Sequence, residues 1–589
     1  MTTVSRFLHV AVIIGLTGLF LSSSIALLLG PVLGSDYTYF LPRLLYGYVW
    51  AVENGLFSIP WYSPAWCGGL PYFADPQVMY FSLPQLLLFA VNPQQAVWLT
   101  VVSFTAIGSV ATYFLLRSPF GLGPWLSLIG AALFAFNDFY LSRMLIGHFT
   151  YHVFPLIPLI ALLVVAETGR QRWLRMLTVL LAGFSIAYLV HGGGANFVVP
   201  AILSVAGLLC IYCIVNPGSF TRLLVNYFAA GFVGLLLSFS KIVSSYSFVR
   251  WFPREHLPLG VFDGWSDAIF SIFTMFFMGP WVVLQDLSTG SIVQGHELRF
   301  GVSIVPFLLF WFGLAALPAL SRKISFPRMI FSVGLVAILF LPVGLSVESE
   351  SIDQALKQLP YFREMSFAVR WLALLIPIVI VVPLLLVHTV IKNIESDVVR
   401  SRSVVVIALI CIALLVISHL YTERFHDSPY DPSAINASYH EVRSGGSLPA
   451  ITEIVAAAPQ ATIFVGVDDA FLAGGSSQIC YQPLFGYKLE RYPIGSLATG
   501  DIFVTHANKL NLKNPACYVY PAENNCEVGD HFTVEQREEA SLFAANHAYP
   551  FEQSPLQVVA NKVSILVFAL CIVLVLVSAI GAVLSRREG

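Results

Sequence analysis

Long apolar runs constrain this chain more than any other feature, because a helix needs about 20 apolar residues to span the hydrocarbon core of a bilayer. The sequence contains about twelve such runs. They cover residues 7–30, 96–116, 124–136, 151–167, 176–191, 196–215, 223–243, 301–320, 329–346, 369–391, 403–420 and 561–584. Only 11% of the 589 residues are charged, against about 25% in an ordinary soluble domain. The chain is therefore predicted to be an α-helical polytopic membrane protein.

The distribution of Lys and Arg between the loops predicts the orientation of the chain. One set of loops carries Arg6, Arg117, Arg170, Arg172, Arg175, Arg222, Arg322, Lys323, Arg328, Lys392, Arg400, Arg402, Arg586 and Arg587. These residues alternate with the predicted spans, so both termini are expected in the cytoplasm of a multi-pass protein in a bacterial inner membrane. The opposite set of loops then faces outward and includes the long segments 31–95, 244–300, 347–368 and 421–560.

Three parts follow from this pattern. Residues 1–420 are expected to form a transmembrane domain with outer loops at 31–95, 244–300 and 347–368. Residues 421–560 are mostly polar and are expected to form a small α+β domain outside the cytoplasm. There "ATIFVGVDD" predicts a strand that runs into a turn, and "TVEQREEASLFAANHA" predicts a short helix with a Thr N-cap. Residues 561–589 would be the last span and a cytoplasmic tail.

Four cysteines, Cys67, Cys480, Cys517 and Cys526, lie in the segments predicted to be outside. They allow three pairings. The short spacing of Cys517 and Cys526 predicts a local disulfide in an oxidising compartment. The CxxC spacing of a zinc site is missing there, so no metal is expected on these cysteines. The formal net charge of −2 excludes a nucleic-acid partner, which requires a strong basic excess.

The first outer loop is rich in aromatic residues. "YFLPRLLYGYVWAVENGLF" predicts an amphipathic helix in the membrane interface, from near Pro42 to Asn54 and Gly55. "SIPWYSPAWCGGLPYFADPQ" is dense in Pro, Gly and Trp, a composition that forms neither a helix nor a central strand. Two interpretations stand for this loop: a sugar or lipid pocket, or a structural loop at the level of the headgroups.

Ionisable residues gather at the outer ends of the predicted spans, where they are costly and tend to mark function. The acids in this set are Asp36, Asp138 and Glu297. The basic members are Arg143, His148, Lys241, Arg250, Arg363 and Arg370. Together they could bind a phosphate group at the membrane surface, with a carboxylate as base. The alternatives are snorkelling anchors for some cations, a merely hydrogen-bonded His148, and an interface cap on the first span for Asp36.

Several motifs resemble the GT-C class of integral-membrane glycosyltransferases over roughly residues 7–420. They are "GSDYTYFLPR" after the first span, "NGLFSIPWYSPAWCGGLPYFADPQ" reaching "YFSLPQ", "GHFTYHVFPLIPL" and "LPYFREMSFAVRW". The resemblance implies an enzyme that moves a sugar from a polyprenyl-phosphate-linked donor to a lipid, glycan or protein acceptor, commonly with inversion. It assigns the base to Asp36 and the donor phosphate to outer Arg and Lys residues.

The chain departs from this class at one position. Asp36 is followed by Tyr37, whereas the members of the class with paired acids often bind a divalent metal. The sequence therefore assigns no metal ligand, although a divalent metal remains possible, with Asp75 or Asp138 as a second carboxylate.

The same chemistry follows from the residues, because a sugar hydroxyl needs a base and a leaving phosphate needs fixed cations. The alternative functions are a lipid or polysaccharide transporter and a non-catalytic assembly protein that binds lipid-linked glycan. A transporter favours broken helices that meet at the midplane and internal repeats. Neither is clear in this sequence.

Overall fold

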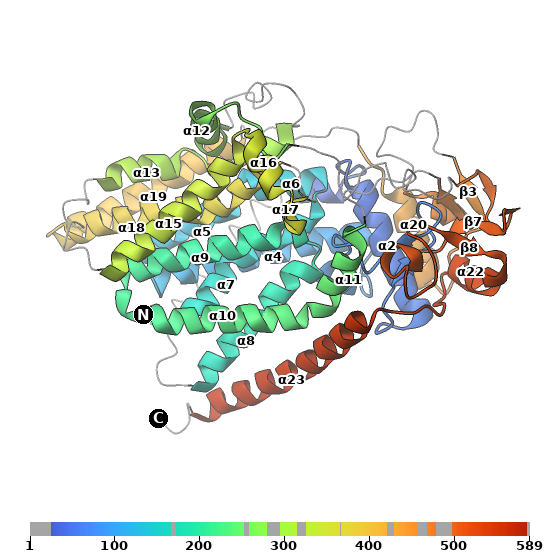
Figure 1. Ribbon diagram of the computed structural model, residues 1–589. Coiled ribbons are helices and arrows are strands. Elements are labelled where there is room, and N and C mark those ends of the chain that lie inside the picture. The colour runs from blue at the N-terminus through green and yellow to red at the C-terminus, as the bar shows by residue number, and fades with distance from the viewer. Residues whose placement is uncertain are drawn as a thin grey trace.

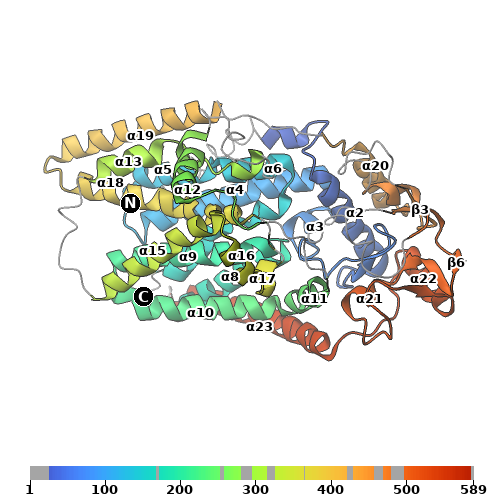
Figure 2. The same ribbon diagram turned by 45° about the horizontal axis from the view of Figure 1, so that its top comes forward.

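The computed structural model describes residues 25–166, 172–251, 258–279, 295–314, 326–363, 365, 367–420, 429–456, 468–478 and 497–585. A long bundle of helices forms one part of the molecule, and helices with short strands form the other (Figures 1 and 2). In these ranges nine helices are long and apolar enough to cross a membrane. They are Pro93–Arg117, Pro124–Ile146, Arg172–His191, Ala195–Val215, Pro217–Leu237, Arg328–Ser346, Ala368–Lys392, Val398–Leu415 and Pro555–Gly581.

The other three predicted runs differ. Most of the run at 7–30 lies outside the described residues. The run at 151–167 forms a shorter apolar helix, Phe149–Val165. The run at 301–320 begins with α13 (Val305–Gly313), and its remainder from residue 315 also lies outside the described residues. The polytopic helical architecture is confirmed, whereas a total of twelve spans is not.

The bundle is built from helices that pack side by side. Its main members are α4 (Pro93–Arg117), α5 (Pro124–Ala135), α6 (Asp138–Ile146), α7 (Leu156–Val165), α8 (Arg172–His191), α9 (Val198–Val215), α10 (Phe220–Leu237), α15 (Phe326–Ser346), α18 (Leu375–Lys392), α19 (Asp397–Leu420) and α23 (Pro555–Ser585). The last helix, α23, lies along α8, α10 and α11 (Phe239–Val249). The stretch between the predicted runs at 124–136 and 151–167 is largely helix α6, which Asn137 caps by accepting from the Tyr140 N–H.

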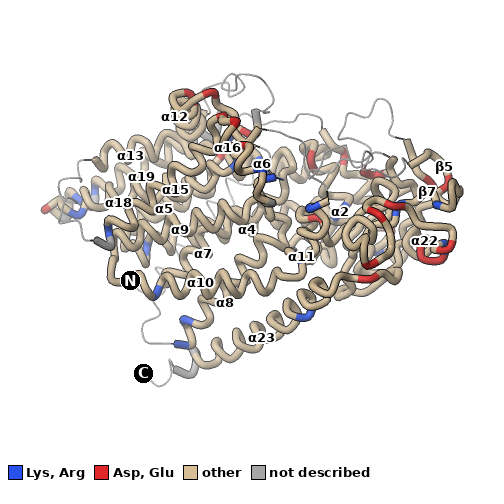
Figure 3. The backbone as a smooth tube through the Cα atoms, viewed as in Figure 1, with Lys and Arg blue, Asp and Glu red and all other residues tan. Residues whose placement is uncertain are grey.

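Basic and acidic residues gather in different parts of the molecule (Figure 3). Lys and Arg occur where α18 joins α19, and Asp and Glu are frequent on the outer segments around α16 (Glu350–Leu356) and α22 (Arg537–Ala544). Arg117 is the last residue of α4, and Lys392 is the last residue of α18. Basic residues at one set of helix ends are the pattern of the positive-inside rule. The placement of both termini in the cytoplasm stays a prediction.

The interfacial helix predicted in the first outer loop is α2 (Tyr37–Asn54). It ends as expected, with Gly55 at a φ of 91°. It begins earlier than expected, and its side chains are buried from Tyr37 to Ala51. Helices α3 (Leu83–Leu87), α4 and α20 (Ser433–Arg443) pack against it. The expectation that this helix lies on a membrane surface is therefore wrong, because other parts of the protein cover it.

The segment at 421–560, predicted to lie outside the cytoplasm, is called the outer segment below. Its described residues contain short helices and strands, as predicted for an α+β region. One sheet has the order β4–β3–β5, with β3 (Glu453–Val455) parallel to β4 (Gly475–Ser477) and antiparallel to β5 (Gly500–Asp501). The second is antiparallel, with β7 between two partners. Its strands are β6 (Thr505–His506), β7 (Lys509–Lys513) and β8 (His531–Thr533).

The local predictions for this segment have separate outcomes. Thr533 forms a capping box with Gln536 directly before α22, as the Thr N-cap predicted. Cys517 and Cys526 form the expected disulfide. The strand expected in "ATIFVGVDD" falls mostly on residues 461–467, which lie outside the described residues.

The Pro- and Trp-rich loop joins the bundle to the outer segment. It forms a small hairpin from β1 (Tyr62–Ser63) and β2 (Leu70–Pro71). The Trp66 indole donates to the carbonyl of Asp468 over 3.0 Å, and the Gly68 carbonyl accepts from the Lys513 N–H over 2.8 Å. The middle of this loop therefore supports the outer segment, which favours the structural interpretation for that part.

Candidate functional site

Asp36 lies in a short segment that packs against the end of α6. Its backbone N–H donates to the carbonyl of Ile146 over 3.1 Å. Gly147 ends α6 with a φ of 104°, and a Cβ there would come within 3.0 Å of the Asp36 side chain. On the other side, Leu33 exchanges two backbone hydrogen bonds of 2.8 Å with Tyr430 of the outer segment. These contacts hold Asp36 at the start of α2.

His148 follows α6 directly and contacts Asp36. Its Nε2 lies 2.7 Å from Oδ2 of Asp36, and its Nδ1 lies 2.6 Å from Nη1 of Arg143. A guanidinium only donates hydrogen bonds, so Nδ1 must accept and the ring proton must sit on Nε2. In this geometry Nε2 donates to the Asp36 carboxylate.

The pKa of Asp36 reflects two opposing effects. Burial raises it, and the contact with His148, which includes the hydrogen bond from Nε2, lowers it. The net pKa lies below the usual value of an aspartate. The side chain keeps 24% of its surface exposed. Asp36 is therefore an ionised carboxylate at neutral pH that can still be reached.

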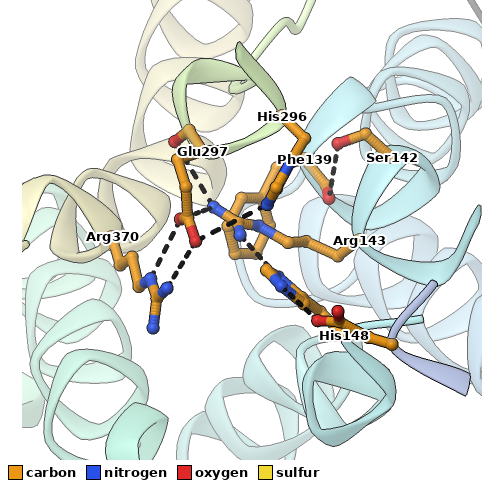
Figure 4. Close-up of polar contacts among 8 residues, drawn as sticks. Phe139, Ser142, Arg143, His148, His296, Glu297 and Arg370 are labelled. Atoms are coloured by element: carbon orange, nitrogen blue, oxygen red, sulfur yellow. Dashed lines mark hydrogen bonds and ion pairs between the residues drawn. The ribbon is translucent and has the colours of Figure 1, made fainter. Parts of the chain in front are cut away.

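Glu297 connects two arginines behind this pair (Figure 4). It lies in the turn Gly295–Leu298, and its carboxylate accepts from Arg143 over 2.6 Å and from Nε of Arg370 over 2.9 Å. The Nη2 group of Arg370 also donates to the other carboxylate oxygen. Burial acts to raise the pKa of Glu297, but the two guanidinium groups hold it well below its usual range. Asp36, His148, Arg143, Glu297 and Arg370 thus form one continuous chain of polar contacts.

A cavity of about 70 Å³ lies beside this chain of contacts. Asp36, His148 and Arg370 line it together. The remaining lining residues are Tyr39, Phe40, Gln77, Thr150, Tyr151, Gly193, Gly194, Asn196 and Phe197. The cavity therefore combines a carboxylate, a guanidinium, neutral polar groups and aromatic rings. This set can bind an anionic group and hydroxyl groups.

The glycine-rich turn after α8 forms one wall of the cavity. Gly193 has a φ of 78°, in the left-handed region that favours glycine. A Cβ at Gly193 would come within 2.6 Å of the Gln77 carbonyl. The turn can therefore approach the first outer loop closely only because it has no side chain there.

Two carboxylates predicted as alternative bases do not reach the cavity. Asp138 is buried at the start of α6, where it pairs with Arg299 over 3.5 Å. Glu297 is held by two arginines, and a carboxylate with such a low pKa is a weak base. Neither residue lines the cavity. Among the three predicted acids, Asp36 alone has the position of a base in this site.

Lys241 is not placed as a phosphate ligand. It is buried, and its ammonium group donates to the carbonyls of Phe73, Asp75 and Val78 over 2.5, 2.6 and 3.2 Å. The Asp75 carboxylate accepts from the Tyr39 hydroxyl over 2.8 Å. Lys241 therefore anchors the first outer loop, and Asp75 is part of that anchor.

The other predicted phosphate ligands also lie apart from the cavity, with the exceptions of Arg370 and His148. Arg143 is fully buried in the polar chain. Arg363 donates to the backbone carbonyl of Arg250 over 3.2 Å, and neither of them lines the cavity. His148 does line it, but its two nitrogens bind Asp36 and Arg143. Arg370 is thus the predicted cation that best fits an anionic ligand.

The described residues include one group that could hold a metal ion: His148, His296 and Glu297, whose ligand atoms lie within 4.8 Å of one another. Burial and the neighbouring His148 lower the pKa of His296 to about 3, so this ring is neutral. However, both nitrogens of His148 are already bonded, and Glu297 binds two guanidinium groups. A divalent cation would displace these bonds and lie beside two positive charges. The arrangement does not fit a divalent metal, and we derive no step through one.

The sequence pattern did not indicate several cavity residues. Gln77 ends the Pro- and Trp-rich motif and Tyr151 lies in "GHFTYHVFPLIPL", but nothing in these motifs singles out either residue as a ligand, and Phe197 is one aromatic residue in an aromatic-rich chain. Their shared position depends on contacts between segments far apart in the sequence. The glycines of "HGGGANF" were a usable signal, because they mark a turn at the same outer face.

Comparison with known proteins yields little. No protein-family model matches the chain, and no curated protein matches it. The solved structures that resemble it include an oligosaccharyltransferase from Archaeoglobus fulgidus, in a complex with Zn and sulfate. The sequence identity is 14% and the TM-score is 0.38. The match covers 79% of this chain and 62% of the length of that chain.

Proposed function

We propose that the protein is a membrane glycosyltransferase that moves a sugar from a polyprenyl-phosphate-linked donor to a lipid, glycan or protein acceptor on the extracytoplasmic face. The observation that carries this proposal is the shared cavity of Asp36 and Arg370. In this cavity a reachable carboxylate and a guanidinium lie together at the ends of apolar helices. A transfer from a phosphate-linked donor needs both groups.

Asp36 acts as the general base in this mechanism. The acceptor hydroxyl attacks the anomeric carbon of the donor, and its proton passes to the Asp36 carboxylate as the new bond forms. A positioned base contributes about 10²–10⁴ in rate to such a step. His148 donates to the same carboxylate and thereby holds its orientation. The attack is a single displacement, which inverts the anomeric centre.

Arg370 acts on the leaving group. As the bond from the anomeric carbon to the phosphate oxygen breaks, the electron pair remains on the lipid phosphate. A fixed guanidinium stabilises this negative charge, and it is best held in place before the reaction. Glu297 provides that rigidity, because it binds Arg370 through two contacts on one edge.

The proposal is tested with purified protein in liposomes and a radiolabelled polyprenyl-phosphate sugar. We expect the label to move to an acceptor in extracts of the host membrane, and to stay on the donor when Asp36→Asn replaces the native protein. Glu538→Gln is the matched control, because Glu538 is an exposed acid on α22. Transport of lipid across the liposome without any sugar transfer by native protein would support the transporter alternative. Donor binding with neither activity would support the non-catalytic assembly protein.

A further inference from the structure

We propose that the Gln77 side-chain amide reads a hydroxyl group of the transferred sugar and so determines which sugar the protein accepts. This inference rests on the proposed function, because it assigns the neutral part of the same cavity. Gln77 lines the cavity together with Asp36 and Arg370. It is one of the neutral polar residues of the lining, and such residues suit the uncharged portion of a phosphate-linked sugar.

The first argument is an unused hydrogen-bonding group. The Oε1 atom of Gln77 is buried and has no hydrogen-bond partner among the described residues. A buried acceptor without a partner is costly, and native proteins keep few of them without a reason. Since Gln77 lines the cavity, a turn of its amide toward the cavity would let a ligand hydroxyl supply the missing donor. The amide nitrogen can donate at the same time, so one side chain can bind two neighbouring hydroxyl groups.

The second argument is that Gln77 is held in place from behind. Its backbone N–H donates to Oδ1 of Asp75 over 2.9 Å. Asp75 is in turn bound by the Tyr39 hydroxyl through its carboxylate and by Lys241 through its carbonyl. Gly193 packs against the Gln77 carbonyl from the other side. The backbone that carries the amide is therefore preorganised, which is what discrimination between similar ligands requires.

The third argument is the composition of the remaining wall. Tyr39, Phe40, Tyr151 and Phe197 present aromatic rings to the cavity. A sugar ring has apolar C–H faces and a polar rim of hydroxyl groups. Aromatic rings suit the faces, and an amide suits the rim. This combination fits a sugar better than it fits a bare phosphate, which would need further cations.

The experiment measures equilibrium binding and transfer with the same donors: undecaprenyl phosphates that carry glucose, galactose or mannose, which differ in the orientation of single hydroxyl groups. The variants are Gln77→Ala, which removes the amide, and Gln77→Glu, which keeps the shape and loses the donor. Gln354→Ala is the matched control, because Gln354 is an exposed glutamine on α16. Thermal unfolding of each variant in detergent checks that the protein is folded.

We expect native protein to prefer one of the three sugars. Gln77→Ala should weaken binding of that sugar by about tenfold, the order expected for one lost hydrogen bond, and should change the other two much less. The result that overturns the inference is an equal loss for all three sugars, or no loss. Binding is measured apart from transfer, so native protein that binds selectively but transfers nothing would contradict the proposed function and leave the role of Gln77 supported.

Discussion

His148 donates a hydrogen bond from Nε2 to Oδ2 of Asp36 over 2.7 Å. The proton is on Nε2 because Arg143 donates to the other ring nitrogen over 2.6 Å. Arg143 therefore selects the tautomer that orients Asp36, although it does not line the cavity itself. His148 is a positioning residue in this arrangement, not the phosphate ligand that its basic neighbours indicated.

The pH dependence of transfer tests this role of His148. Asp36 must be ionised to accept a proton, and His148 lowers its pKa against the opposing effect of burial. Activity of native protein should therefore persist as the pH falls into the usual aspartate range and be lost only below it. In His148→Ala the largest effect that opposes burial is lost, so the pKa of Asp36 rises and the acidic limb of the profile moves to higher pH.

His148→Gln is the control for this measurement, since its amide can still donate to Asp36 but does not titrate. It should move the acidic limb less than His148→Ala does. A purely structural role of His148 would lower the rate at every pH and leave the limb in place.

The stability of the first outer loop tests the role of Lys241. Lys241→Met keeps the length of the side chain but leaves the carbonyls of Phe73, Asp75 and Val78 without their donor. A buried acceptor left without a partner costs about 1–3 kcal/mol, so we expect a clear fall in the unfolding temperature in detergent. Lys562→Met, at an exposed position on α23, should have no such effect. Weaker donor binding at unchanged stability would instead restore Lys241 as a phosphate ligand.

The sequence predicted the helical membrane architecture well, because apolar length depends only on local composition. It also grouped Asp36 and Arg370 as candidate site residues, because both lie at the outer ends of predicted spans. It did not predict which charges neutralise one another. Lys241 binds carbonyls more than 160 residues away in the chain, and Asp138 binds Arg299 at a separation of 161. Such pairs form only when the bundle packs, so charge and position along the chain cannot separate a ligand from an anchor.

The orientation of the chain is tested with reporter fusions. Basic residues at one set of helix ends predict that the outer segment lies outside the cytoplasm, and the disulfide between Cys517 and Cys526 agrees with an oxidising compartment. A phosphatase fused near residue 500 should therefore be active, and a fluorescent protein fused after residue 589 should fold in the cytoplasm. A fusion near residue 500 that is active only as a cytoplasmic reporter would reverse the assignment and remove Asp36 from the outer face.

Separate effects on turnover and on binding test the roles of Asp36 and Arg370. Asp36→Asn keeps the shape but cannot accept the proton, so kcat should fall by about 10²–10⁴ while donor binding stays nearly unchanged. Arg370→Ala removes a charged partner of the phosphate, so the donor should bind more weakly by about 1.5–3 kcal/mol. It also leaves Glu297 with Arg143 as its remaining arginine partner, so Arg370→Lys is needed to separate charge from geometry. A lysine keeps the charge and loses the paired contact, and we expect it to restore part of the binding.

Single-turnover rates and equilibrium binding of one radiolabelled donor distinguish these effects, with expression and unfolding temperature matched among the variants. Arg250→Ala is the control for Arg370, because Arg250 is an exposed arginine that does not line the cavity. Full turnover in Asp36→Asn would mean that another residue is the base. That residue would be neither Asp138 nor Glu297, because neither lines the cavity. Equal loss of donor binding in Arg250→Ala and Arg370→Ala would indicate a general attraction between the basic outer face and an anionic lipid, and would remove the specific contact from the mechanism.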